Sequence, residues 1–147
     1  MNRMKGVTSE CCLTTSCTVV KTVNYPPYTK ELVERESFWL DKLKHTGFVP
    51  ELIDVYKNSI TMSYCGEVLN SENMPNDFYK QLSDIKTQLL YHRCFYNDWK
   101  HDNILVLQNK IYLIDFGWTP MIKEDYTCGG YATSNLTRKV GGDFFLL

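Results

Sequence analysis

The 147-residue chain contains a short segment whose polar side chains are spaced for phosphate chemistry. Asp98, Lys100 and Asn103 place a carboxylate, an ammonium and an amide at positions one, three and six of one turn. Twelve residues after Asn103, a second carboxylate, Asp115, begins the sequence Asp-Phe-Gly. Carboxylate and amide oxygens are the ligands that a hard cation such as Mg²⁺ prefers. The spacing therefore indicates magnesium-assisted phosphoryl transfer.

Two apolar runs between these motifs predict a β-hairpin. Residues 104–107 and 111–114 are rich in β-branched and other apolar side chains, and the polar stretch 108–110 between them is short enough for a tight connection. Asn103 stands at the entrance of this hairpin and Asp115 at its exit. We therefore expect both oxygen ligands at the same end of the hairpin, where they would hold a divalent ion and nucleotide phosphates.

The order Asp-x-Lys-x-x-Asn, strand, turn, strand, Asp-Phe-Gly resembles the catalytic and metal loops of the protein kinase superfamily. The resemblance implies that Asp98 is the catalytic base and that Lys100 neutralises the moving phosphoryl group. It also implies that Asn103 and Asp115 are magnesium ligands and that ATP is the phosphate donor. The alternative is an Asp N-cap followed by an ordinary hairpin turn.

A lysine and a glutamate further upstream are expected to pair. Residues 17–23 read as a β-strand that contains Lys21, and residues 30–44 have helical periodicity. Glu36 lies on the apolar stripe of that helix, where an unpaired carboxylate would cost several kcal/mol, so Lys21 is its natural partner. The apolar stripe consists of Leu32, Val33, Leu40 and Leu43.

The resemblance to protein kinases includes this pair. It implies that Lys21 holds the α- and β-phosphates of ATP and that Glu36 positions Lys21. Glu31 and Glu34 are close to Glu36 in the sequence and are alternative partners for the lysine.

The next segment resembles the last strand and hinge of a kinase small lobe. Residues 51–56 and 59–63 read as two strands around a turn at Lys57 and Asn58. The resemblance implies that the backbone of Ser63 to Cys65 binds the adenine edge, with Met62 behind the base. From Asp77 onward a helix is predicted under the catalytic loop, with its apolar stripe formed by Phe78, Leu82, Ile85 and Leu89.

Two departures from the kinase pattern bear on function. No Gly-x-Gly-x-x-Gly precedes Lys21, and Gly6 is the only glycine upstream, so the loop over the phosphates is expected to be shorter or to use hydroxyl and amide groups of residues 7–16. Tyr96 and Asn97 replace the usual His-Arg before the catalytic aspartate. Switching by a phosphorylated activation loop is therefore not expected.

The expected fold class is α+β, as a single kinase-like domain over residues 1–147. Residues 1–66 would form the small nucleotide-binding lobe, with a hinge at 63–66, and residues 67–147 a reduced large lobe. Only 30 residues follow Gly117, and no Ala-Pro-Glu signature is present, so we expect a miniature member that lacks most of the large lobe. The apolar end, residues 144–147, is expected to pack beneath the hairpin or to bind a protein partner.

Composition limits the other classes of function. Sixteen basic and 17 acidic residues give a net charge of −1, which offers no footprint for nucleic acid or an anionic membrane. No apolar run approaches the ~20 residues of a membrane span, and no secretion signal is recognised, so a cytoplasmic protein is expected. The six cysteines lack a Cys-x-x-Cys pair and the three histidines are dispersed, which favours reduced thiols over disulfides or a zinc site.

The combined interpretation is an ATP- and magnesium-dependent phosphotransferase. Lys100 favours a Ser or Thr hydroxyl of a protein as the acceptor, because it matches the protein kinase pattern. A kinase of a small-molecule hydroxyl is an alternative. A catalytically silent module of the pseudokinase type, which binds nucleotide or a partner, is the other alternative.

Overall fold

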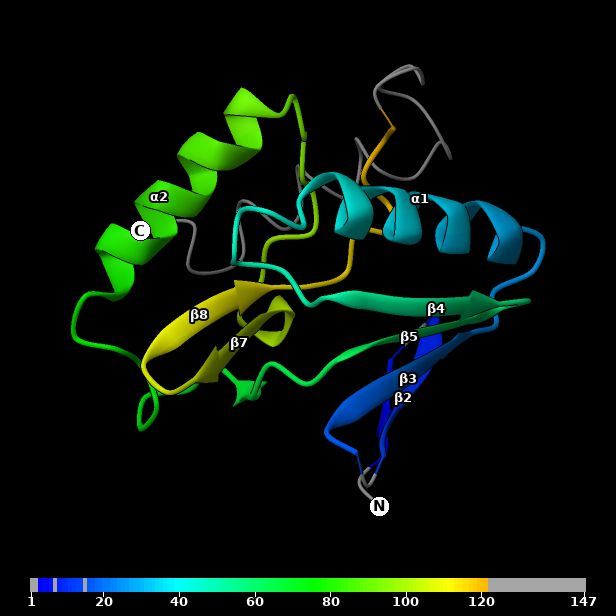
Figure 1. Cartoon of the computed structure of the whole chain (residues 1–147), viewed down its shortest axis with the longest axis horizontal. Helices are drawn as coiled ribbons and strands as arrows, with labels where there is room; N and C mark the ends of the chain where they lie inside the picture. The colour runs from blue at the N-terminus through cyan, green and yellow to red at the C-terminus, as the bar shows by residue number, and fades with distance from the viewer. Residues whose placement is uncertain (1–2, 7, 15, 122–147) are drawn as a thin grey trace.

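The computed structural model describes residues 3–6, 8–14 and 16–121. Within them two antiparallel sheets form, one with the strand order β1-β2-β3-β5-β4 and a smaller one with the order β6-β7-β8 (Figure 1). The mixture of helices and sheets confirms the α+β class. The elements are β1 (Arg3–Lys5), β2 (Ser9–Leu13), β3 (Thr18–Val23), α1 (Thr29–Lys42), β4 (Leu52–Tyr56), β5 (Ser59–Ser63), β6 (Glu67–Val68), α2 (Phe78–Tyr91), the 3-10 helix His101–Asn103, β7 (Ile104–Leu107) and β8 (Lys110–Leu113).

Helix α1 covers one face of the five-stranded sheet (Figure 1). Lys21 lies on that face, between Cys11 of β2 and Ile60 of β5 in the strand register. The buried residues of α1 include the apolar Leu32, Val33, Trp39 and Leu40 and also the charged Arg35 and Glu36. Each large apolar side chain buried in this way contributes roughly 1.5–3 kcal/mol. This burial packs α1 against the sheet next to Lys21.

Helix α1 begins one residue earlier and ends two residues earlier than the predicted 30–44. At its start the Thr29 hydroxyl accepts a hydrogen bond from the Tyr25 amide at 2.9 Å. At its end the Thr46 hydroxyl donates to the Leu43 carbonyl at 2.6 Å, and Gly47 adopts a φ of 84°. The Thr46 side chain therefore satisfies a carbonyl at the end of the helix.

The segment before β3 was expected to be a shorter loop or a loop that uses hydroxyl and amide groups. In the structure it contains two strands. Residues 9–13 form β2, which pairs along its whole length with β3, and a shorter β1 pairs with β2. Serine and cysteine are weak indicators of a strand, and the pairing partner lies outside the segment itself. The register places Cys11 directly beside Lys21.

The hairpin of β7 and β8 is present, with one correction to its turn. The second strand begins at Lys110 and not at residue 111, so the connection has two residues, Gln108 and Asn109, with φ values of 51° and 64°. Two consecutive residues in the left-handed region form the tight turn that matches the twist of a hairpin. The pairing of Ile104 with Leu113 brings the two ends of the hairpin together.

The connection between the two sheets passes through Gly66. Its φ is 103°, and a Cβ at this position would collide with the backbone carbonyl of Val106 in β7. Glycine is therefore required where the chain leaves β5 and forms the short strand β6, which pairs with β7. Strand β6 was not predicted, because two residues carry no detectable period.

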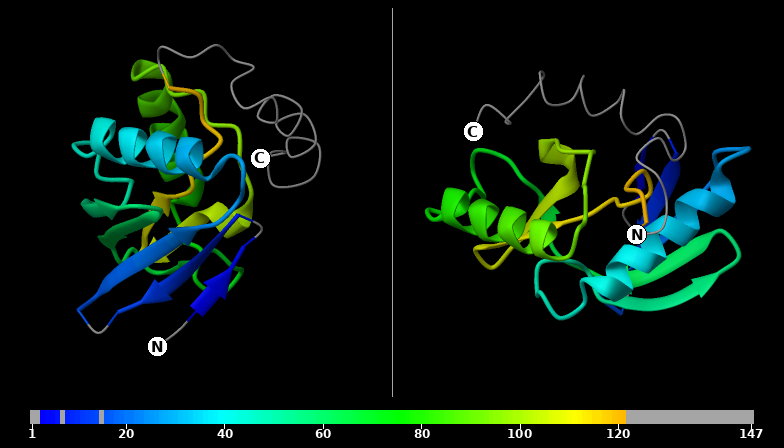
Figure 2. Two further views of the ribbon diagram at one scale, coloured as in Figure 1. Left: turned by 90° about the vertical axis from the view of Figure 1, so that its right-hand side faces the viewer. Right: turned by 90° about the horizontal axis from the view of Figure 1, so that it is seen from above.

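Helix α2 and the small lobe both hold the hairpin. The stripe of Phe78, Leu82, Ile85 and Leu89 is buried as predicted. Gln81 of α2 donates to the Asn109 carbonyl at 2.8 Å and accepts from the Ile111 amide at 2.9 Å. The Leu113 amide donates to the Phe48 carbonyl at 2.8 Å, in the segment that follows α1. Viewed from above, α1 and α2 lie at opposite ends of the molecule (Figure 2).

None of the helices among the described residues is long and apolar enough to cross a membrane. The expected packing of residues 144–147 lies outside the described residues.

Candidate active site

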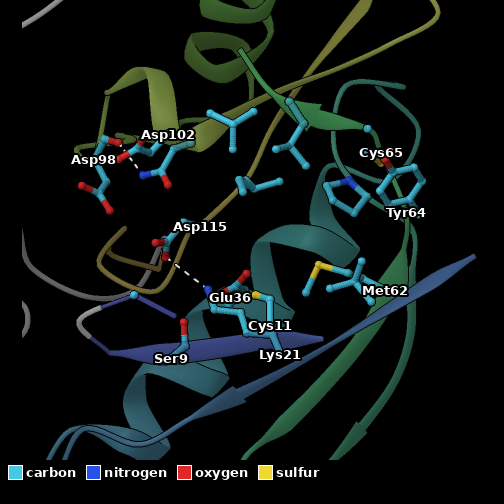
Figure 3. Close-up of a pocket in the computed structure, with 18 of the residues that line it drawn as sticks. Ser9, Cys11, Lys21, Glu36, Met62, Tyr64, Cys65, Asp98, Asp102 and Asp115 are labelled. Carbon is cyan, nitrogen blue, oxygen red and sulfur yellow. Dashed lines mark hydrogen bonds and ion pairs between the residues drawn. The ribbon is translucent and has the colours of Figure 1, made fainter. Parts of the chain in front are cut away.

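A cleft of about 440 Å³ opens between the five-stranded sheet and the hairpin. Figure 3 shows its polar end around Asp98 and Asp115 and its less polar end around Met62 and Cys65. The tertiary structure therefore brings together residues that are up to 94 positions apart in the sequence. All nine predicted site residues line it: Lys21, Glu36, Met62, Ser63, Cys65, Asp98, Lys100, Asn103 and Asp115.

A buried ion pair forms the floor of the cleft. Lys21 Nζ lies 2.6 Å from Glu36 Oε1 and 3.4 Å from Asp115 Oδ1. The pairing of Lys21 with Glu36 is the contact that the helix pattern predicted. The alternative partner Glu34 is half exposed and lies 3.9 Å from Lys30. Glu36 points inward because it shares the face of α1 that packs on the sheet.

The Lys21 ammonium attracts both carboxylates of the floor, whereas Glu36 and Asp115 repel each other. Burial by itself would lower the pKa of Lys21, but the nearby carboxylates of Asp115 and Glu36 raise that pKa well above its usual range. Burial would raise the pKa of Asp115, and the Lys21 ammonium reverses this and holds it below the usual range. Burial raises the pKa of Glu36 against the opposing effect of Lys21. These shifts favour the charged forms of Lys21 and Asp115.

The predicted catalytic loop has irregular backbone that internal hydrogen bonds hold in place. Asn103 Nδ2 donates to the backbone carbonyl of Asp98 at 2.8 Å. The Tyr96 hydroxyl donates to the Ile114 carbonyl at 2.6 Å, and the Ile114 amide donates to the Asn103 carbonyl at 3.0 Å. Lys100 lines the cleft and also lowers the pKa of Asp115. These bonds link the loop to the end of the hairpin.

Asn103 and Asp115 form a donor set that fits Mg²⁺. Because the amide nitrogen of Asn103 is bonded to Asp98, its Oδ1 is the atom left to bind a cation. Asp115 contributes carboxylate oxygens from a residue with a φ of 68°, in the left-handed region that aspartate tolerates. Mg²⁺ is typically bound by one or two carboxylates together with phosphates and water. Among the described residues no cluster of three or more His, Cys, Asp and Glu side chains could hold a different metal.

At the less polar end of the cleft, fewer backbone amides can donate to an adenine base than the sequence predicted. The Ser63 amide donates to the Glu51 carbonyl at 2.9 Å, and the Tyr64 amide donates to the Cys17 carbonyl at 3.0 Å. Neither amide is therefore available to a base. In the part of the chain that the structure describes, Cys65 carries the remaining backbone donor of this stretch. Met62 is buried and forms part of the adjoining wall.

Several lining residues were not singled out from the sequence. Gly6, Thr8 and Ser9 form a turn at the phosphate end, closed by a hydrogen bond from the Gly6 amide to the Ser9 carbonyl at 2.8 Å. The hydroxyl-rich composition of residues 7–16 was the signal for this turn. Cys11 also lines the cleft near Lys21 (Figure 3), and burial raises the pKa of its thiol. The position of Cys11 beside Lys21 follows from the strand register, and no local sequence pattern predicts it.

The fold and the cleft together define a protein of the protein kinase-like class. The residues of the floor, the two loops and the hinge have the order and the spatial arrangement that this class uses to hold a nucleotide. A protein-family model described as the RIO domain matches residues 18–125. The chain therefore belongs to the RIO domain family, whose members are atypical protein kinases.

A solved relative confirms the kinase-like fold. The chain is similar to Rio2 kinase from Chaetomium thermophilum, crystallised as an ADP/Mg²⁺-phosphoaspartate complex, with a TM-score of 0.66 and 19% sequence identity. The similarity covers 95% of this chain and 52% of that kinase, so the chain spans about half its length. No curated protein matches the chain.

Proposed function

We propose that the protein is an ATP- and magnesium-dependent phosphotransferase that transfers the γ-phosphate to a Ser or Thr hydroxyl of a protein. The observation that carries this proposal is the contact of Lys21 with both Glu36 and Asp115 in a cleft that also contains Asp98 and Asn103. A scaffold has no physical need for a buried cation, a metal-type donor pair and a further carboxylate at one site. Membership of the RIO domain family supports the same class of reaction.

The cleft can accommodate a nucleotide in one orientation. Its volume is within the range of roughly 300–1,000 Å³ that small-molecule sites occupy. The adenine would lie at the Met62 end, where the Cys65 N–H is a donor, and the phosphates would lie beside Lys21. The opposite orientation would place the phosphates beside the buried Cys65 thiol and apolar side chains, which would not compensate for their lost hydration.

The proposed reaction assigns one task to each polar group. Asn103 and Asp115 would hold Mg²⁺, which when bound supplies positive charge to the phosphates. Asp98 would accept the proton of the acceptor hydroxyl while the hydroxyl oxygen forms a bond to the γ-phosphorus. The bond between that phosphorus and the bridging oxygen breaks, and ADP leaves. Lys21 and Lys100 would stabilise the charge on the phosphate oxygens.

The acceptor can be identified from the chemistry of the product. Lys100 in the catalytic loop favours a protein hydroxyl, which would yield a phosphoester that resists hydroxylamine. The phosphoaspartate of the Rio2 kinase complex makes an acyl phosphate a second candidate product. Asp115 is the carboxylate that supports it here, because it lies in the cleft with its side chain 26% exposed. Hydroxylamine cleaves an acyl phosphate and therefore distinguishes the two products.

The experiment that tests the proposal uses the full chain, γ-labelled ATP, Mg²⁺ and a panel of protein and small-molecule acceptors. We expect hydroxylamine-resistant label on a protein acceptor and its loss in Asp98→Asn. Asp84→Asn is the matched control, since Asp84 is an exposed carboxylate of α2 that pairs with Lys80. Equal transfer by wild type and Asp98→Asn would contradict the role of Asp98, and no transfer by either would favour the binding-module alternative.

A further inference from the structure

Three buried side chains hold the backbone that follows the Asp-Phe-Gly sequence. The carbonyls of residues 117–119 each accept a hydrogen bond from a different side chain. Arg35 Nη1 donates to the first at 3.0 Å, Asn97 Nδ2 to the second at 2.8 Å and Trp39 Nε1 to the third at 3.2 Å. Because all three donors are buried, loss of any one leaves an unpaired polar group away from water. This stretch of backbone is therefore fixed at consecutive peptide units.

The donors come from both sides of the cleft. Arg35 and Trp39 lie one turn apart on the same face of α1, whereas Asn97 belongs to the predicted catalytic loop. Arg35 also directly precedes Glu36, the residue that holds Lys21. A single segment of α1 thus controls the positions of Lys21 and of the backbone after Asp115.

Gly117 connects Arg35 to Asp115. Asp115 Oδ1 would lie 3.7 Å from a Cβ placed at Gly117, so the carboxylate lies against this residue, and the Gly117 carbonyl accepts the hydrogen bond from Arg35. The Arg35 guanidinium also lies 6.0 Å from the Trp118 ring centroid, and Trp118 packs edge-on against Tyr25. Arg35 therefore holds the residue against which the Asp115 carboxylate lies.

We propose that Arg35, assisted by Asn97, is a positioning residue that orients Asp115 for the metal ion. The inference rests on the proposed function, since it concerns the same Mg²⁺ site. Arg35 touches neither the metal nor the nucleotide in this scheme and acts through Gly117. Its removal should therefore weaken the response to Mg²⁺ and leave the contacts between the protein and the nucleotide intact.

The first test titrates ADP into the full chain at a series of Mg²⁺ concentrations. Arg35→Met should raise the Mg²⁺ concentration for half-maximal binding by about tenfold, the change expected when a hydrogen bond from a charged donor is lost. Saturating Mg²⁺ should restore the wild-type affinity for ADP. Arg35→Lys, which keeps a charged donor, should fall between Arg35→Met and wild type. An unchanged Mg²⁺ requirement in Arg35→Met would overturn the proposal.

A matched control separates positioning from general destabilisation. Ile85→Ala removes buried apolar contacts of α2 and lowers stability by a mechanism unrelated to Asp115. Its Mg²⁺ requirement should equal that of wild type. If Ile85→Ala shifts the requirement as far as Arg35→Met does, the Arg35 effect is structural and the proposal is wrong.

Amide hydrogen exchange of the free protein provides a test that does not depend on ligand binding. The amides of residues 116–119 should exchange faster in Arg35→Met and in Asn97→Ala, and at the wild-type rate in Ile85→Ala. Unchanged exchange in the first two variants would show that these side chains do not hold the loop. If the wild-type protein shows no Mg²⁺-dependent ADP binding, the proposed function and the metal role of Arg35 are both wrong. Faster exchange of residues 116–119 in Arg35→Met and Asn97→Ala would still show that these side chains hold the loop.

Discussion

The two walls of the cleft hold their chemical groups in different ways. On the small-lobe wall, Lys21 and Glu36 lie on a regular strand and helix, and their charges are buried against each other. On the opposite wall, Asp98 and Asn103 lie on irregular backbone that hydrogen bonds to main-chain carbonyls keep in place. The charges of the first wall stabilise the fold, and we propose that they also bind phosphate. The second wall is held through main-chain carbonyls, and the Asp98 side chain on it is the proposed base.

The largest expected effect is on turnover, at the second wall. Asp98→Asn should lower the rate by about two to four orders of magnitude, the usual contribution of a general base. Its melting temperature and ADP affinity should match wild type, because Asn103 and Tyr96 contact the backbone carbonyl of Asp98, which the substitution retains. Rates from labelled ATP and melting curves provide the measurement. A large loss of stability in Asp98→Asn would show that the Asp98 side chain also stabilises the fold, which would contradict the proposed difference between the two walls.

The next largest effect is on folding, at the first wall. Lys21→Met leaves Glu36 buried without its cation, which should lower the free energy of unfolding by about 3–5 kcal/mol. ADP affinity should fall as well, because the same ammonium faces the phosphates. Urea unfolding and nucleotide titration measure the two losses. The exposed control Lys80→Met should change neither, since Lys80 only pairs with Asp84 on the surface.

A double-mutant cycle sharpens this result. Glu36→Gln should partly restore the stability of Lys21→Met, because the neutral amide removes the unpaired charge. The coupling free energy between the two positions should be about 0.5–3 kcal/mol. Additive losses of stability in the cycle would contradict the pairing of Lys21 with Glu36 as the source of the first wall's stability.

The smallest expected effect is the pH dependence of stability that involves Asp115, where the two walls meet. The pKa of Asp115 is held below its usual value by Lys21 despite burial, so the folded state binds a proton less readily than the unfolded state. The resulting stabilisation is present above the unfolded pKa of about 3.9 and is lost as the pH falls through the folded value. Asp115→Asn should therefore lose less stability than wild type during acidification below about pH 4. Parallel acid unfolding curves for the two proteins would contradict this electrostatic account.

Much of the site could be predicted from the sequence because its residues lie in short, local motifs. Asp98, Lys100 and Asn103 share one turn, and the two apolar runs that follow require Asp115 to return to the same end. Glu36 was predicted from its place on an apolar helical stripe, because a carboxylate on a buried face needs a cation. Local spacing and the cost of burying charge were sufficient in these cases.

The hinge illustrates what local patterns could not provide. The sequence predicted a hinge at residues 63–66, but which amides face a base depends on what the chain places beside them. Ser63 and Tyr64 donate to the carbonyls of Glu51 and Cys17, which come from distant segments. Backbone donors are chemically identical in every residue except proline, so only the folded chain distinguishes those that are occupied from those that are available.

Asn97 is a second residue whose role local sequence patterns could not predict. In the sequence it appears as the loss of an arginine that would read a phosphate, and Arg35 appears as one more charged residue in a helix. In the folded protein both are buried donors to the backbone that follows Asp115. The sequence by itself predicted which residues would carry the chemistry, because motif spacing and periodicity are local properties. The tertiary structure decided which residues hold them in position, because a hydrogen bond to a main-chain carbonyl is specified by proximity and leaves no pattern in the sequence.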